Sequence, residues 1–219
     1  MERWATFDCY GTLVDWRAGI GGQLARLFGD ERAPGLLEAY YRLEPAAQAD
    51  GALPYREVLA VTLRGVAAEA GLAVPAGEED ALGRSLPGWP VFPDVATSLQ
   101  EARSRGWRLA ILSNCDRDLI EASIDAIGVP FDHVVAASEI GSYKPAPRHW
   151  EAFAEQTGVG PGGHVHVAQS AFHDIATAAS LGLPSVWINR LGEPPGPPCS
   201  RELPDLAGLA DVLDELAPA

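Results

Sequence analysis

The fold of this 219-residue chain is decided by the stretch Trp4-Ala5-Thr6-Phe7-Asp8-Cys9-Tyr10-Gly11-Thr12-Leu13. Its first four residues form a short, uncharged and largely apolar run that ends in an acid, Asp8, and a turn containing Gly11 follows. Such a run is typical of a strand that is buried on both faces of a parallel sheet. The stretch therefore predicts a first strand over 4–7 and a loop at its carboxyl end.

Four later segments repeat this pattern, with helical periodicity between them. Short apolar runs occupy 108–112, 134–136, 165–167 and 184–188. Between them, Ile120, Ile124 and Ile127 recur at helical spacing before Gly128, and the spacing predicts helices over 117–127, 149–156 and 175–181. Alternating strands and helices build a parallel sheet that is covered on both faces. We therefore expect an α/β fold with a doubly wound, five-stranded parallel sheet.

Residues 16–92 break this alternation, because they show helical periodicity without a convincing strand. Tyr55, Val58, Leu59 and Val66 share one helical face before Gly71, and three prolines at 87, 90 and 93 mark the return to the sheet. We expect two domains, a sheet-containing core over 1–15 and 93–219 and an inserted helical domain over 16–92. The segment 192–199 is rich in proline and glycine and predicts a surface loop before a last helix.

Composition excludes several classes of partner. Sixteen Lys and Arg residues stand against thirty Asp and Glu residues, and the net charge of −14 argues against nucleic acid and anionic membranes as partners. Early acids rule out a signal peptide, and no apolar run approaches the ~18 residues of a membrane span. Three widely spaced cysteines favour neither a disulfide framework nor a zinc site. We expect a cytoplasmic protein. Fifteen of the sixteen basic residues are arginine, so the lone lysine, Lys144, stands out.

The residues just after each strand are the candidate site, because ligands of doubly wound sheets bind at the carboxyl ends of the strands. Asp8 and Thr12 follow the first strand, Ser113 and Asn114 follow the second, and Lys144 precedes a later helical unit. After the fourth strand come three further polar residues, Gln169, Ser170 and Asp174. Four loops thus bring two acids, a lysine, hydroxyls and amides to one edge.

This ordered set resembles the haloacid dehalogenase-like hydrolase superfamily, and within it the type II (L-2-)haloacid dehalogenases. The resemblance rests on four segments, Phe7–Leu13, Leu112–Asn114, Tyr143–Pro145 and Trp187–Arg190, and it spans nearly the whole chain. It implies a Rossmann-like catalytic core, with the helical insertion as the cap. It also implies an enzyme without a cofactor or metal that acts on a small anionic molecule, and a possible homodimer.

The resemblance implies a role for each candidate residue. Asp8 would attack the halogen-bearing carbon of a short 2-haloacid to form a covalent ester, and Asp174 would orient the water that hydrolyses it. Lys144 would balance the two acids, and Thr12 would orient Asp8. Ser113 would hold the substrate carboxylate, and Arg42 of the aromatic-arginine pair Tyr41-Arg42 would receive the halide together with Asn114. The remaining substrate-binding residues would be Tyr10, Gln169 and Ser170.

Tyr10 and Gln169 separate this reading from its alternatives. The superfamily's phosphatases carry a second acid where this chain has Tyr10, and a phenol with a pKa near ~10 is a poor donor to a departing alcohol at neutral pH. A halide leaves without a proton. Those phosphatases also use two acids in the fourth loop to hold Mg²⁺, whereas here Gln169 stands five positions before Asp174. A Mg²⁺-dependent phosphatase and a silent binding protein with the same fold remain as alternatives.

Overall fold

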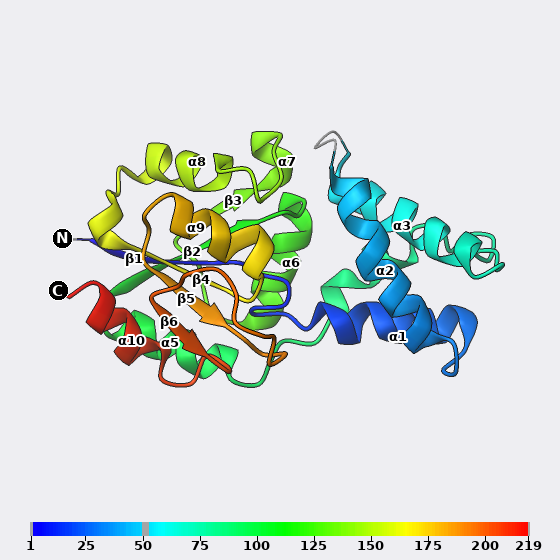
Figure 1. Ribbon diagram of the computed structural model, residues 1–219, viewed down its shortest axis with the longest axis horizontal. Helices are drawn as coiled ribbons and strands as arrows, with labels where there is room; N and C mark the ends of the chain where they lie inside the picture. Colours follow the sequence, from blue (N-terminus) through cyan, green and yellow to red (C-terminus); the bar gives the residue numbers. More distant parts are fainter. Residues whose placement is uncertain (1, 50–52, 219) are drawn as a thin grey trace.

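The structure, a computed structural model, describes residues 2–49 and 53–218 and centres on a parallel sheet. Six strands lie in the order β3-β2-β1-β4-β5-β6, and every neighbouring pair is parallel (Figure 1). This arrangement confirms the predicted α/β class with a doubly wound sheet. The strand bounds are β1 Arg3–Phe7, β2 Trp107–Ser113, β3 His133–Ala136, β4 His164–Ala168, β5 Ser185–Ile188 and β6 Arg201–Leu203.

Helices cover both faces of the sheet, because successive residues of its central strands point to opposite sides. On one side, Leu109 and Ile111 of β2 pack in the main core with helices α5, α6 and α10. On the other, Ala110 and Leu112 pack with Trp150 of α8 in a separate cluster. The bounds are α5 Val95–Ser104, α6 Arg117–Ile127, α7 Ala137–Ile140, α8 Arg148–Thr157, η2 Pro161–Gly163, η3 Ala171–Ile175, α9 Ala176–Ser180 and α10 Leu209–Leu216.

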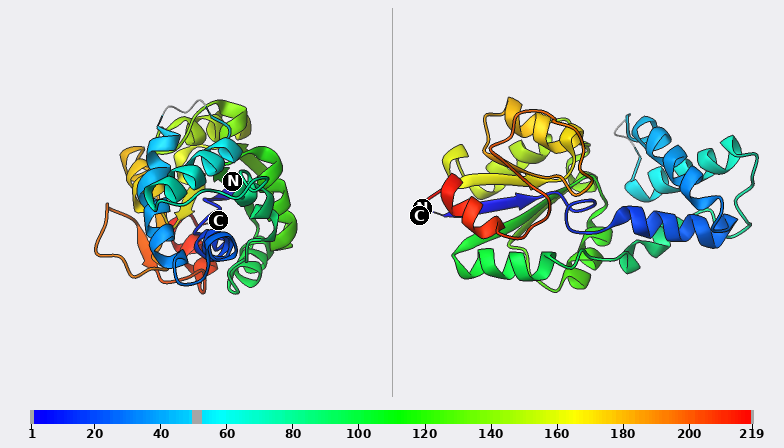
Figure 2. Two further views of the ribbon diagram at one scale, coloured as in Figure 1. Left: turned by 90° about the vertical axis from the view of Figure 1, so that its right-hand side faces the viewer. Right: turned by 60° about the horizontal axis from the view of Figure 1, so that its bottom comes forward.

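The helical insertion lies beyond one end of the sheet, opposite the chain termini (Figures 1 and 2). Buried leucines and aromatic residues of its helices pack against one another and join the main core. The two connecting segments meet at its base, where the Asp15 amide donates a hydrogen bond of 2.7 Å to the Pro90 carbonyl. The elements are α1 Trp16–Phe28, α2 Ala33–Gln48, α3 Tyr55–Glu69, α4 Ala81–Ser85 and η1 Leu86–Gly88.

Asp116, in the sheet-containing part, forms hydrogen bonds to the helical insertion. Asp116 immediately precedes α6, where it could cap its own helix, yet its side chain makes no such bond. Its carboxylate instead accepts hydrogen bonds from the first two amides of α3, those of Tyr55 at 2.9 Å and Arg56 at 3.0 Å. Unpaired amides at a helix start are satisfied by such acceptors. Asp116 therefore links the insertion to the sheet edge.

Two details differ from the sequence prediction. The sheet has a sixth strand, β6, where the sequence predicts five strands. The sequence gives no signal for β6 because this edge strand has only three residues and no apolar run. The predicted helix over 175–181 begins earlier, as the π-helical turn η3, and continues as α9. In the described parts of the chain, no helix has the length and apolar character needed to cross a membrane.

Candidate active site

A small pocket lies at the carboxyl edge of the sheet, beneath the helical insertion. Its volume of about 110 Å³ suits a ligand of only a few heavy atoms. The loops after β1, β2 and β4 and the loop before α8 contribute its floor, and the insertion contributes its roof. The lining residues are Asp8, Tyr10, Trp16, Glu44, Gln48, Tyr55, Ser113, Asn114, Lys144, Gln169, Ser170, His173 and Asp174.

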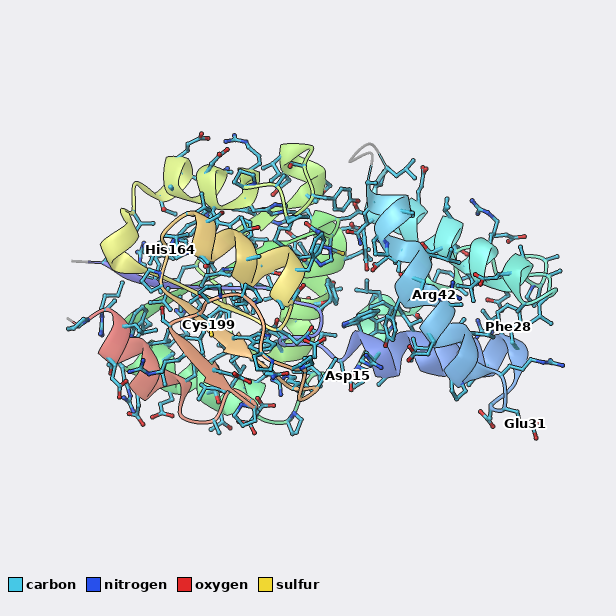
Figure 3. The ribbon with its side chains drawn as sticks, in the orientation of Figure 1. Asp15, Phe28, Glu31, Arg42, His164 and Cys199 are labelled. Atoms are coloured by element: carbon cyan, nitrogen blue, oxygen red, sulfur yellow. The ribbon has the colours of Figure 1, made fainter. Side chains whose placement is uncertain are left out.

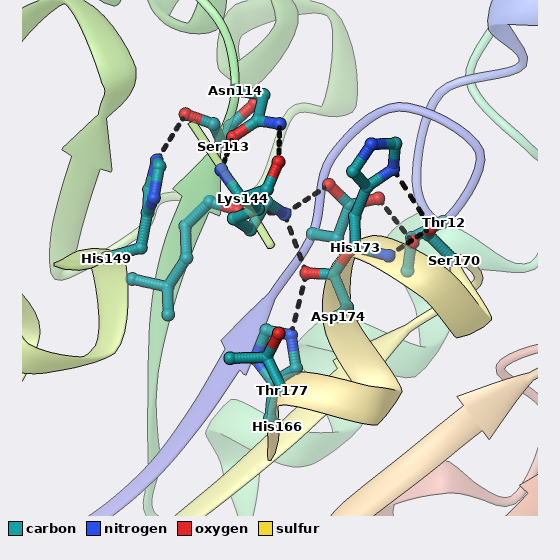
Figure 4. A network of polar contacts seen from close by, with 12 residues as sticks. Thr12, Ser113, Asn114, Lys144, His149, His166, Ser170, His173, Asp174 and Thr177 are labelled. Atoms are coloured by element: carbon teal, nitrogen blue, oxygen red, sulfur yellow. Dashed lines mark hydrogen bonds and ion pairs between the residues drawn. The ribbon is translucent and has the colours of Figure 1, made fainter. Parts of the chain in front are cut away.

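The floor is built around Lys144, which is buried with 2% of its surface exposed. Its ammonium nitrogen Nζ lies 2.9 Å from Asp8 Oδ1, 2.7 Å from Asp174 Oδ1 and 2.9 Å from the Leu112 carbonyl oxygen (Figure 4). An ammonium has three N–H donors, and these three acceptors use all of them. The chain's lone lysine therefore joins the two acids.

Asp8 is oriented from its other side by Thr12. The Thr12 hydroxyl donates to Asp8 Oδ2 at 2.9 Å and accepts a hydrogen bond of 2.9 Å from the Gln169 amide. The turn between them requires Gly11, whose φ of +97° lies in a region that other residues rarely adopt. A Cβ at this position would also approach the side chains of Gln169 and Trp16 to 3.0 Å. The local sequence thus fixes Oδ2 of Asp8, and Lys144 holds Oδ1.

The pKa values of the two acids are shifted in opposite directions. Burial is the largest influence on Asp8 and raises its pKa, the Lys144 charge opposes this, and the Asp174 charge adds to it, so the pKa lies above its ordinary value. Burial also acts to raise the pKa of Asp174, but Lys144 and a hydrogen bond from His166 outweigh it and hold that pKa well below its ordinary value. Burial lowers the pKa of Lys144, but the two carboxylates more than compensate and keep it raised. Asp174 and Lys144 thus form an ionised pair beside Asp8.

A row of buried polar side chains supports Asp174 from below. His166 Nε2 lies 3.0 Å from Asp174 Oδ1, and His166 Nδ1 lies 2.9 Å from the Thr6 hydroxyl, which also contacts His164 Nε2 at 2.6 Å. Burial lowers the pKa of His164 to about 3, so that its ring is neutral at neutral pH. The second oxygen of Asp174, Oδ2, is buried and has no hydrogen-bond partner among the described residues. One oxygen is thus fixed and the other remains an open acceptor.

The loop after β2 holds the backbone of Lys144 in place. Asn114 Oδ1 accepts the Lys144 amide hydrogen at 2.6 Å, and Asn114 Nδ2 donates to the Lys144 carbonyl at 3.0 Å (Figure 4). Ser113 is buried next to it, and its carbonyl lies 3.0 Å from His149 Nε2. Asn114 therefore positions the lysine and also borders the pocket.

Tyr10 borders the pocket, but its hydroxyl is held elsewhere. The oxygen lies 3.0 Å from the Ser123 hydroxyl and 3.5 Å from the Leu119 carbonyl, both in α6. Burial, reinforced by Cys115 and Cys9, raises the pKa of this phenol well above its ordinary value of 10. The group two residues after Asp8 is therefore a weaker acid than a free phenol.

The donor set does not fit a Mg²⁺ ion of the kind that phosphatases of this fold use. Asp8 and Asp174 both direct an oxygen at the Lys144 ammonium. The side-chain nitrogen Nε2 of Gln169 lies 3.4 Å from Glu193 Oε2. Mg²⁺ binds through carboxylate and water oxygens. Here the positive charge between the two acids is supplied by the lysine ammonium. Among the described residues, no group of three or more potential metal ligands is found.

Arg42 lies outside the active-site pocket, contrary to the sequence prediction. Sequence reasoning placed it at the departing halide, but its guanidinium points away from the pocket and pairs with Glu69 Oε1 at 2.8 Å, with 62% of the side chain exposed (Figure 3). It borders a different surface pocket. The reason is helical phase, since residues two positions apart on a helix do not share a face. Glu44, two residues later, faces the active-site pocket instead.

The sequence analysis also missed most residues of the pocket roof and one residue, Arg190, that stabilises the turn after β1. Tyr40, Glu44 and Gln48 recur every four residues, a spacing that indicates one helical face. Arg190, in the downstream segment, donates to the Thr12 carbonyl at 2.9 Å and pairs with Asp94 at 2.8 Å, which secures the turn after β1. His173, two residues into the turn after Ala171, also lines the pocket. The remaining additions to the roof are Trp16 and Tyr55.

The fold and site define an α/β enzyme-like protein with a buried acid–lysine–acid cluster under a helical insertion. Residues 3–182 match the haloacid dehalogenase-like hydrolases, so the chain belongs to this hydrolase family. It is 28% identical to (S)-2-haloacid dehalogenase 4A of Burkholderia cepacia over 99% of this chain and 94% of that one. It is 31% identical to a phosphoserine phosphatase of Thermus thermophilus over 86% of this chain and 73% of that one. A solved L-2-haloacid dehalogenase superposes with a TM-score of 0.86 at 25% identity, covering 97% of this chain and 99% of that chain.

Proposed function

We propose that the chain is a metal-independent hydrolytic dehalogenase that converts short 2-haloacids into 2-hydroxyacids and halide through a covalent ester on Asp8. The (S)-2-haloacid dehalogenase relative, which matches nearly end to end, supports this activity. The small pocket volume is consistent with a short substrate. The roles of the individual residues follow from their contacts.

In the first step, an oxygen of Asp8 attacks the carbon that bears the halogen. A carbon–oxygen bond forms, the carbon–halogen bond breaks, and the electron pair leaves with the halide. Thr12 and Lys144 each fix one oxygen of Asp8, so the carboxylate is held in one orientation. Burial removes water from Asp8, which makes an ionised carboxylate a better nucleophile. We assign Ser113 to the substrate carboxylate and Tyr10, Asn114, Gln169 and Ser170 to the remaining substrate contacts, and the position of all five in the pocket lining supports this assignment.

In the second step, water attacks the ester carbonyl of Asp8. Asp174 accepts one proton of the water and the carbonyl carbon–alkoxide bond of the ester breaks. The departing alkoxide takes the second water proton and leaves as the 2-hydroxyacid, which regenerates the Asp8 carboxylate, and Asp174 then releases its proton to solvent. The low pKa of Asp174 keeps it ionised, and its buried oxygen Oδ2 is an acceptor without a partner among the described residues, which supports this role. Lys144 balances the negative charge that the two acids bring together.

The observation that carries this proposal is the environment of Tyr10. A phosphatase of this fold must protonate an alcohol oxygen as it departs, whereas a halide needs no proton. The Tyr10 hydroxyl is held by Ser123, and its pKa is raised. The group at this position therefore suits the departure of a halide.

A Mg²⁺-dependent phosphatase is a second candidate, because the Thermus thermophilus relative is a phosphoserine phosphatase. One pair of assays separates it from the dehalogenase. The proposal expects chloride release from 2-chloropropionate and chloroacetate in the presence of EDTA, and its complete loss in Asp8→Asn. Phosphate release from phosphoserine that requires Mg²⁺, without chloride release, would establish the phosphatase instead. No turnover of any of these substrates would favour a silent binding protein.

We further propose that residues 16–92 act as a mobile cap over a catalytic core formed by 1–15 and 93–219. The insertion contributes the pocket roof, and the two connecting segments meet at its base, which supports this division. A cytoplasmic location accords with three unpaired cysteines. A homodimer is the expected assembly in solution, and sedimentation analysis tests it.

A further inference from the structure

Arg190 lies just beyond the end of β5, next to the turn that carries Thr12. Its guanidinium donates twice to the Thr12 carbonyl, from Nε at 3.1 Å and from Nη2 at 2.9 Å. The Thr12 hydroxyl in turn donates to Asp8 Oδ2 at 2.9 Å. Arg190 thus reaches the proposed nucleophile through one intermediate residue.

The same guanidinium also holds the second segment that connects the sheet to the insertion. Its nitrogens Nη1 and Nη2 pair with the two carboxylate oxygens of Asp94 at 3.1 and 2.8 Å. The guanidinium carbon lies 3.9 Å from the centre of the Phe92 ring. Bidentate pairing and stacking on an aromatic ring both depend on the planar guanidinium, which lysine lacks. These contacts hold Arg190 in one orientation against this segment.

The Arg190–Asp94 pair is shielded from water and charged. The two side chains are 9% and 16% exposed. Burial acts to raise the pKa of Asp94, but hydrogen bonds from Arg190 and from the Leu206 amide outweigh it and hold this pKa below its ordinary value. Salt screens a partly buried pair less than an exposed one. The pair is therefore a firmer link than an exposed pair such as Arg42–Glu69.

The two connecting segments are also joined to each other at this place. The Phe92 amide donates to the Leu13 carbonyl at 3.0 Å, and the Asp15 amide donates to the Pro90 carbonyl at 2.7 Å. Phe92 thus contacts Arg190 with its ring and the turn after β1 with its backbone. Any movement of the insertion relative to the sheet must pass through these segments, because they are its covalent connections.

We propose that Arg190 is a positioning residue for the first chemical step, and that it couples the placement of the helical insertion to the orientation of Asp8. It clamps the turn that carries Thr12 against the segment that carries Phe92 and Asp94. This inference rests on the proposed dehalogenase function. Arg190 takes no part in bond making or breaking, and it acts on the reaction through Thr12.

A double-mutant cycle in the full-length protein tests this role. The measured quantity is kcat/KM for chloride release from chloroacetate, which reports on events up to cleavage of the carbon–chlorine bond. Arg190→Lys keeps the charge but loses the planar group, and it should lower kcat/KM about tenfold or more, because a displaced nucleophile reacts more slowly. In a Thr12→Val background the same exchange should change kcat/KM by less than about twofold, because the hydroxyl through which Arg190 acts is gone.

Hydrogen exchange gives a readout that does not depend on activity. The Phe92 and Asp15 amides should exchange about fivefold faster or more in Arg190→Lys, since the clamp on both connecting segments is weakened. Asp94→Asn weakens the same clamp from its other side and should repeat both results, which guards against a folding defect of Arg190→Lys.

Arg105→Lys is the matched control, because Arg105 also pairs with several carboxylates but lies between α5 and the start of β2, at the end of the sheet opposite the pocket. Its partners are Glu101, Asp211 and Asp214. This variant should leave kcat/KM and the exchange of both amides unchanged.

Equal effects of Arg190→Lys with and without the Thr12 hydroxyl would overturn the inference and leave the dehalogenase function intact. Wild-type exchange at the Phe92 and Asp15 amides in Arg190→Lys would overturn it as well. Absence of chloride release from the wild-type protein would defeat the proposed function and the role of Arg190 in it together.

Discussion

The ammonium of Lys144 lies 2.7 Å from Asp174 Oδ1 and 2.9 Å from Asp8 Oδ1, so one buried cation joins two acids that are 166 residues apart in sequence. Two carboxylates at such close quarters would raise each other's pKa, and the ammonium offsets this. The pair Lys144–Asp174 is nearly inaccessible to water.

Lys144→Arg should lower kcat/KM by at least about 100-fold despite the conserved charge. A planar guanidinium is larger than an ammonium and cannot direct donors at Asp8, Asp174 and the Leu112 carbonyl within the same buried space. Chloride release measures the effect. Arg148→Lys, an exposed exchange in the opposite direction on α8, should keep full activity. Wild-type activity in Lys144→Arg would contradict the role given to the lysine.

Asp174→Asn should separate the two chemical steps. Asp8 keeps its Thr12 and Lys144 contacts, so the ester still forms, but its hydrolysis lacks the proton acceptor. We expect a burst of about one chloride per protein molecule followed by a rate at least about 100-fold below wild type. Mass spectrometry should find the substrate fragment on the peptide that contains Asp8. Steady turnover without a burst would exclude Asp174 as the base.

His166→Phe should slow the second step about tenfold or more, because Asp174 loses the hydrogen bond that orients its carboxylate. That bond helps to lower the Asp174 pKa, so its loss should raise this pKa and move the acid limb of kcat to higher pH. A purely structural role would not move the limb. His166→Gln, which retains an N–H donor, should restore part of the rate. His133→Phe, a change at a partly exposed ring that contacts Gln156, serves as the control.

The acid limb of kcat/KM should lie above the ordinary aspartate pKa of 3.8, because the pKa of Asp8 is raised by burial. The nucleophile must be ionised, so activity falls as pH falls through that raised pKa. Thr12→Val removes a hydrogen bond that lowers it and should move the limb further up. Thr97→Val, an exposed site on α5, should leave the profile unchanged. A limb that does not respond to Thr12→Val would argue that another group controls it.

Asp116→Ala should loosen the insertion from the sheet edge. Two amide hydrogen bonds at the start of α3 are lost, a change worth about 1 kcal/mol, which corresponds to roughly fivefold in an opening equilibrium. Hydrogen exchange at the Tyr55 and Arg56 amides should accelerate, and KM should rise by a similar factor. Asp125→Ala, on the exposed side of α6, provides the comparison. Unchanged hydrogen exchange at those amides would show that the Asp116 hydrogen bonds do not restrain α3.

The floor of the site could be predicted from sequence because it depends on local patterns. Asp8, Ser113 and Asp174 each follow a strand that the hydrophobic pattern reveals, and parallel strands bring their carboxyl ends to one edge. Lys144 was identified by its rarity and the motif around it. Their clustering follows from topology once the strands are placed. The edge strand β6 escaped prediction because it has three residues and little burial.

The sequence by itself determined the α/β class, the helical insertion and the residues that meet at the floor, since periodicity and strand ends are local properties. Only the tertiary structure decided which face of α2 covers the pocket, and it turned Glu44 inward and Arg42 outward. The physical reason is that helical phase relative to the sheet depends on how α1, α2 and α3 pack, which no local pattern specifies. The same long-range packing brought His166 beneath Asp174 and Asp116 to the start of α3.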